Sequence, residues 1–195
     1  MDIKSAYEIA MEKVDKIEAA TEEEKLSWKY TPEGEKLAAK YLKENIDLNS
    51  EISKFETKAV KYITDGAANT LIHNIAMPKN EIAKNNNKKA MDGIKAIKKD
   101  KAKTENVLSQ IRRLFSHYTE QGEQQRKQAY QQVKAAFEMK VQQALEQQGG
   151  VPAGAKIDIE KQPQFQEEWR KILNQLDSQY TKLLEDFKRE LVEIP

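Results

Sequence analysis

The sequence contains no cysteine, which excludes disulfide bonds, thiolate nucleophiles and cysteine metal clusters among its 195 residues. No uninterrupted apolar run approaches the roughly 18 residues that a membrane-spanning helix requires. The first residues, MDIKSAYEIAMEKVDKIEAA, carry charges throughout and lack the apolar core of a signal peptide. We therefore expect a cytoplasmic protein without a membrane span.

Aromatic residues make up only 7% of the chain, and Leu, Ile, Val and Phe together number 41. Charged residues make up 33%, but acids and bases nearly cancel to a net charge of +1. This balance favours an ordered chain, in which long helices touch along one apolar stripe and need few core residues per unit length. We predict a single all-α domain over residues 1–195, built as elongated antiparallel helical hairpins. The coiled-coil-like bundle should have four to six helices, with at least one longer than 40 residues.

Two helices are predicted in the first half of the chain. The first covers residues 2–20, because apolar residues recur at spacings of 4, 3, 4 and 3 at Ile3, Tyr7, Ala10, Val14 and Ile17. The second covers 32–77, starting at the cap Thr31 and the proline Pro32 and stopping at Pro78. Between them, the alternation of Leu26, Trp28 and Tyr30 with polar residues predicts a short extended segment.

The second half of the chain predicts two more helices, at 79–148 and 164–193, joined by a glycine- and proline-rich linker at 149–163. The pattern leaves open whether the chain bends at Gly66 or at Gly122, since an interior glycine costs about 1 kcal/mol relative to alanine. Three poor helix formers at 85–87, all asparagine, indicate a frayed turn just after the connection at 77–80.

The last predicted helix has the most regular apolar pattern. Its seven large apolar residues stay within a band of about 80° at 100° per residue, so they form one narrow seam. The members of this seam are Phe165, Trp169, Ile172, Leu176, Tyr180, Leu183 and Phe187. A seam of this kind packs internally as core or docks a homodimer or another protein partner, and the internal role is favoured.

Residues 79–103 hold nine lysines and three acids. On a helix, four of these lysines form a stripe opposite the apolar face, namely Lys84, Lys88, Lys95 and Lys99. This is the pattern of a solvated helix face. The same stripe could bind an acidic protein or membrane partner, or nucleic acid, although no arginine or aromatic residue is interleaved with the lysines.

No motif points to catalysis, a metal or a cofactor. A di-metal bundle needs Glu three residues before each histidine, but Thr70 precedes His73 and Leu114 precedes His117 at that spacing. The segment GGVPAGAKI, 149–157, lacks the adjacent Gly-Lys and the hydroxyl of a phosphate loop. Carboxylate pairs are numerous but are expected by chance in a chain with 32 acids.

The sequence thus predicts a non-enzymatic helical interaction protein, such as an adaptor, assembly or stalk-like component. It should bind a protein partner or another copy of itself through long amphipathic helix faces. The alternative is a nucleic-acid- or ribosome-associated protein that uses the lysine stripe. No small-molecule substrate is evident.

Overall fold

The computed structural model describes residues 20–44, 46–147 and 158–195. Across these ranges the chain is helical and without strands, so the all-α prediction is confirmed. The elements in chain order are α2 (Glu22–Lys43), α3 (Leu48–Ile52), α4 (Thr57–His73), α5 (Glu81–Ile97), α6 (Lys101–Gln147), the 3-10 turn η1 (Ile159–Lys161) and α7 (Pro163–Glu193). The helix predicted at 2–20 lies outside the described residues, apart from its last position.

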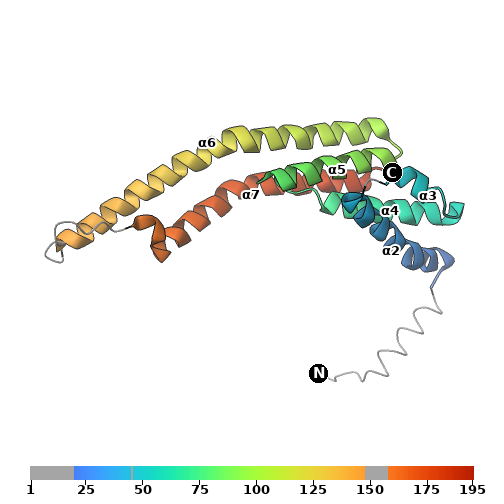
Figure 1. Ribbon diagram of the computed structural model, residues 1–195, viewed down its shortest axis with the longest axis horizontal. Coiled ribbons are helices and arrows are strands. Elements are labelled where there is room, and N and C mark those ends of the chain that lie inside the picture. Colours follow the sequence, from blue (N-terminus) through green and yellow to red (C-terminus); the bar gives the residue numbers. More distant parts are fainter. Residues whose placement is uncertain (1–19, 45, 148–157) are drawn as a thin grey trace, which may run out of the picture.

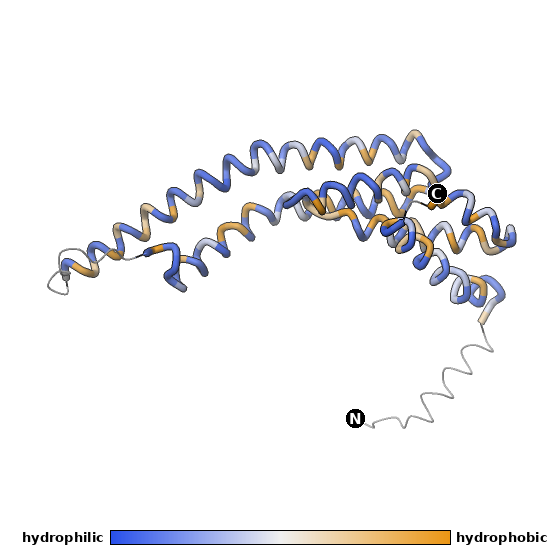
Figure 2. Tube along the Cα trace, in the orientation of Figure 1, coloured by the Kyte–Doolittle hydropathy of each residue, from blue (hydrophilic) through white to orange (hydrophobic). Residues whose placement is uncertain are grey.

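The molecule is elongated because α6 is long. It has 47 residues, or about 70 Å of helix, which confirms the prediction of a helix longer than 40 residues. Figure 1 shows α6 and α7 running side by side beyond the other helices as a two-helix arm. We define the arm as α6 from Gly122 onward together with η1 and residues 163–176 of α7, and the body as the remainder. Hydrophobic residues gather where the body helices overlap, whereas α6 is mostly hydrophilic along the arm (Figure 2).

Helix α2 begins at Glu22, before the start at residue 32 that was predicted for the second helix. Thr21 caps α2 by accepting a hydrogen bond from the Glu24 N–H, and the Glu24 carboxylate accepts one from the Thr21 N–H in return. The prediction of an extended segment around Trp28 is therefore wrong, because this capping box starts a helix that includes Trp28. Pro32 lies inside α2 rather than at its start.

The helix predicted at 32–77 is three helices in the structure. Asp47 begins α3 by accepting hydrogen bonds from the Asn49 and Ser50 N–H groups. The chain then turns after Ile52, and α4 starts at Thr57 and ends at His73, before Pro78 is reached. Leu48 and Ile52 nevertheless face the core, as the apolar pattern predicted.

Two glycines allow α2 and α4 to cross closely. A Cβ on Gly66 would overlap the carbonyl oxygen of Thr31, and one on Gly34 would overlap the carbonyl oxygen of Ile63. Gly66 therefore does not bend α4, because the missing side chain is what lets the two backbones touch. Buried alanines line the same crossing at Ala38, Ala59 and Ala67.

The connection between α4 and α5 is held by a buried asparagine. Asn87, 2% exposed, accepts a hydrogen bond from the Ala76 N–H at 2.9 Å and donates one to the Ala76 carbonyl at 2.6 Å. Asn80 caps α5 by accepting from the Ala83 N–H. The frayed turn predicted at 85–87 is wrong, because these contacts and the cap hold that stretch within α5.

The helix predicted at 79–148 divides at residues 98–100 into α5 and α6. The Lys98 side chain is buried and donates to the carbonyls of Val192, in the last turn of α7, and Ile194, the residue that follows α7. The Lys99 N–H donates to the Pro195 carbonyl, and Asp100 starts α6 by accepting from the Lys103 N–H. A tertiary contact and a cap together end one helix and begin the next.

The remaining boundaries follow the sequence pattern more closely. The chain passes through Gly122 within a continuous α6, and α7 begins at Pro163, one residue before the predicted start. Most of the predicted linker lies outside the described residues, and η1 occupies part of its end. The core runs through all helices of the body and includes Tyr180, Leu184 and Leu191 of α7 and its C-cap Ile194.

Candidate functional site: a groove between α6 and α7

The apolar seam of α7 is only partly consumed by internal packing. Phe165 and Tyr180 are buried, and Leu183 is 47% exposed. The other four members, Trp169, Ile172, Leu176 and Phe187, are half-buried. The seam therefore serves as core at its buried positions and leaves apolar surface accessible between them.

In the arm, the seam packs on α6 through aromatic rings. The Phe165 ring lies edge-on to the rings of Tyr130 and Phe137, each at 5.8 Å between centroids, and Trp169 contacts Tyr130 at 5.1 Å. The Lys134 ammonium binds the Glu160 carboxylate of η1 at 2.6 Å and holds the pKa of that carboxyl below its usual value. These contacts fasten the two arm helices together.

Nearer the body, side chains of α6 and α7 line an open groove of about 770 Å³. Five apolar side chains line it: Leu114, Ile172, Leu176, Leu183 and Phe187. The polar lining consists of Gln110, Arg113, His117, Gln125, Gln175, Gln179 and the hydroxyl-bearing Tyr180. No carboxylate belongs to the lining in the part of the chain that the structure describes.

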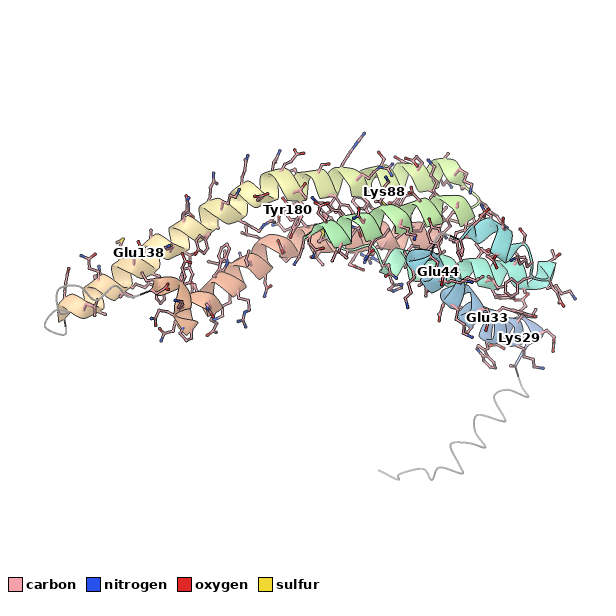
Figure 3. All side chains as sticks on the ribbon, viewed as in Figure 1. Lys29, Glu33, Glu44, Lys88, Glu138 and Tyr180 are labelled. Carbon is pink, nitrogen blue, oxygen red and sulfur yellow. The ribbon has the colours of Figure 1, made fainter. Side chains whose placement is uncertain are left out.

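A polar network closes the inner side of the groove, where Tyr180 lies between the two helices (Figure 3). The Tyr180 hydroxyl lies 2.9 Å from His117 Nδ1. Asp177 accepts a hydrogen bond from the Tyr118 hydroxyl at 3.3 Å and pairs with the guanidinium of Arg126 at 3.4 Å.

The Asp177 carboxylate also binds the Lys79 ammonium at 3.2 Å, so it ties α7 both to α6 and to the α4–α5 connection. The Arg126 guanidinium stacks over the Tyr118 ring at 4.2 Å. Burial first, and then the Asp177 charge, raise the pKa of the Tyr118 hydroxyl above its ordinary value. With three donors on one carboxylate, this network is suited to fixing the helices in register rather than to transferring protons.

The lysine stripe lies on the exposed face of α5 and the turn that follows it; Figure 3 labels Lys88 on this face. Lys84 pairs with Glu81 at 2.6 Å, and Lys95 pairs with Glu105 at 2.8 Å. Lys88 and Lys99 are exposed. All four lysines are accessible, but two of them already hold a carboxylate, which a phosphate would have to displace.

The described residues hold no cluster of three or more His, Asp or Glu side chains that could bind a metal ion. His73 bonds to the carbonyl of Asn69 through Nδ1, and His117 to Tyr180, so the two histidines lie in separate local contacts. Among the same residues, no helix combines the length and the apolar character needed to cross a bilayer.

Sequence reasoning identified the α7 wall of the groove but missed the α6 wall. The signal for the second wall was Leu114, which lies about 60° from Ile111 and so extends the apolar face of α6 sideways at 100° per residue. The arginine and histidine beside it, Arg113 and His117, were not connected with the seam because they are far from α7 in the sequence.

A family model matches residues 49–193, a range that includes every residue lining the groove and the whole lysine stripe. The chain belongs to this family. It is described as a family of unknown function, DUF6657. No curated protein and no solved structure matches the chain. The family match begins within α3, so α2 and the residues before it lie outside the matched range although α2 packs on α4.

Proposed function

We propose that this member of the family is a non-enzymatic helical interaction protein that binds an amphipathic helix of a protein partner in the α6–α7 groove. The observation that carries the proposal is the accessible apolar lining, above all Leu183 with 47% of its surface exposed. An apolar groove between two helices is a surface on which a third helix completes a three-helix bundle.

The shape of the groove supports a helical ligand over a compact small molecule. Its walls run from Gln110 to Gln125 and from Ile172 to Phe187, so each spans 15 residue steps, about 22 Å of helix. Amide side chains on the rim can bond to a polar helix face without a buried charge. Helix-in-groove recognition uses apolar anchors at spacings of three and four residues, which such a length accommodates over about four turns.

Site-specific photo-crosslinking tests the proposal in the native host. A photoreactive amino acid at Leu183 should form a covalent adduct with a defined partner protein, since this side chain faces the groove opening. The same probe at Asn174, an exposed α7 residue outside the groove lining, is the matched control. Adducts at both positions alike, or at neither, would contradict binding in the groove.

The nucleic-acid alternative stays a prediction. Lysine–phosphate contacts release counterions, so binding through the stripe should weaken steeply with salt. Filter binding of mixed RNA and DNA at low salt, with Lys88→Glu and Lys99→Glu as the charge-reversed comparison, measures it. Retention of nucleic acid that both reversals abolish would favour this alternative.

A further inference from the structure

The groove lining carries a positive charge, at Arg113, and no carboxylate among the described residues. Arg113 stands on the lining, exposed, and forms no salt bridge with any residue that the structure describes. Many other bases with accessible side chains are paired within one turn, such as Lys36 with Glu33 and Lys25 with Glu22. A ligand that fits must therefore offer an apolar face together with a carboxylate beside it.

The sequence before α2 has this chemistry. If residues 2–20 form a helix, Ile3, Tyr7, Ala10, Val14 and Ile17 fall within a band of about 80°. From Ile3 to Ile17 the seam is 14 steps, or about 21 Å, which matches the length of the groove. The segment carries five carboxylates and three lysines, and Glu18 is the charged residue that lies closest to the seam at 100° per residue.

The position of α2 decides which copy of this segment can reach the groove. The capping box at Thr21 starts α2 at Glu22, and α2 packs against α3, α4 and α5. Figure 1 shows the start of α2 at the end of the body away from the arm. Only a few residues separate Ile17 from Thr21, which at about 3.5 Å per extended residue is too short a tether to reach a groove on the arm side of the body.

We infer that the groove binds residues 2–20 of a second copy of this chain as an amphipathic helix, in a reciprocal dimer. This inference rests on the proposed function and names the ligand of the groove. Contact between two grooves is the poorer fit, because two concave surfaces cannot fill each other and would bring the two Arg113 side chains together. A convex helix with a flanking carboxylate fills the groove and neutralises the arginine.

Sedimentation equilibrium of the full chain, over about 1 to 500 µM, tests the inference. We expect a dimer whose dissociation constant rises at least about tenfold in Val14→Asp, which places a charge on the seam. Ile9→Asp introduces the same charge in the same segment about 120° from the centre of the seam and should leave the dimer intact. On the groove side, Leu183→Asp should weaken the dimer and Asn174→Asp should not.

Mixing the two weakened variants separates this arrangement from every other dimer. The Val14→Asp chain keeps an intact groove and the Leu183→Asp chain keeps an intact segment, so together they form one complete pair and should restore dimers. Arg113→Glu should weaken the dimer, and adding Glu18→Lys in the same chain should recover most of the loss. Far-UV circular dichroism of each variant confirms that the helices are retained.

A chain that is monomeric at all concentrations would overturn the inference, as would a dimer that Val14→Asp and Ile9→Asp affect equally. Failure of the mixed variants to dimerise would overturn it too. None of these results removes the proposed function, which fails instead if a photoreactive group at Leu183 captures no protein more than the same group at Asn174.

Discussion

Replacing Gly66 with alanine should destabilise the body, although alanine is the better helix former. A Cβ at this position would overlap the carbonyl oxygen of Thr31 and lie 3.0 Å from its carbonyl carbon, where ordinary contacts begin at 3.4 Å. The obstacle is backbone on α2, so no side-chain rotation relieves it. The two helices must move apart by about 1 Å, which forfeits a quarter to a half of the dispersion energy across the gap.

The magnitude follows from two opposing terms. Overpacking of a core costs about 1–3 kcal/mol, and a backbone obstacle places Gly66→Ala near the upper end of that range. The gain in helix propensity returns about 1 kcal/mol. The unfolding free energy should therefore fall by about 2 kcal/mol, which corresponds to a drop of about 4–8 °C in melting temperature for a chain of this size.

Gly122→Ala is the matched control in the interior of α6. Its Cβ would meet the ends of two side chains, Arg126 at 3.2 Å and Tyr180 at 3.3 Å, which can shift by a few tenths of an ångström. Helix propensity then dominates, and the variant should be as stable as the original or up to about 1 kcal/mol more stable. Urea unfolding followed by far-UV circular dichroism measures both variants. Equal or raised stability in Gly66→Ala would refute the close crossing of α2 and α4.

Three further predictions concern other contacts. Asn87→Ala removes both hydrogen bonds to Ala76 and should lower the unfolding free energy by about 2 kcal/mol. The control Asn86→Ala, at an exposed position, should raise it slightly. Similar urea midpoints for the two variants would contradict a stabilising role of the Asn87–Ala76 contacts. Burial lowers the pKa of Lys98, so the unfolded chain binds more protons than the folded chain between that lowered pKa and 10.5. The stability of the original chain relative to Lys98→Met should therefore increase as pH rises through this window. A stability difference that stays flat or falls with pH would refute the lowered pKa. Small-angle scattering of the monomeric species should give a radius of gyration above about 19 Å, against about 16 Å for a compact chain of this length.

The long helices could be predicted from sequence because their stability depends on stripes that the sequence displays directly. Seam positions on α7 recur over 22 residues, and no tertiary contact is needed to see them. The breaks were harder to predict. Asp47 and Asp100 are ordinary helix caps, but each stands within an apolar period that continues across the break, so the period alone suggested an unbroken helix.

Tertiary contacts explain what the local pattern could not give. Gly34 and Gly66 are indistinguishable in sequence from weak points of a helix, and only the crossing of α2 and α4 shows that backbone contact requires them. Lys98 ends α5 while bound to carbonyls almost a hundred residues away. The groove was half predictable for the same reason: the seam is local to α7, whereas Arg113 and His117 join it only through the pairing of α6 with α7.

Because α6 continues unbroken from the body into the arm, this helix sets the length and the orientation of the arm. The 25 residues of α6 beyond Gly122 place the end of the arm at Gln147 about 38 Å from Gly122. They also fix the direction of each residue at this tip of the arm relative to the body. Seven residues inserted into both arm helices would lengthen the reach by about 10 Å and return the faces to within about 20° of their original phase. Two inserted residues would add only about 3 Å but turn the tip by about 200°. Whatever contacts the tip is thus presented at a set distance and a set angle from the groove.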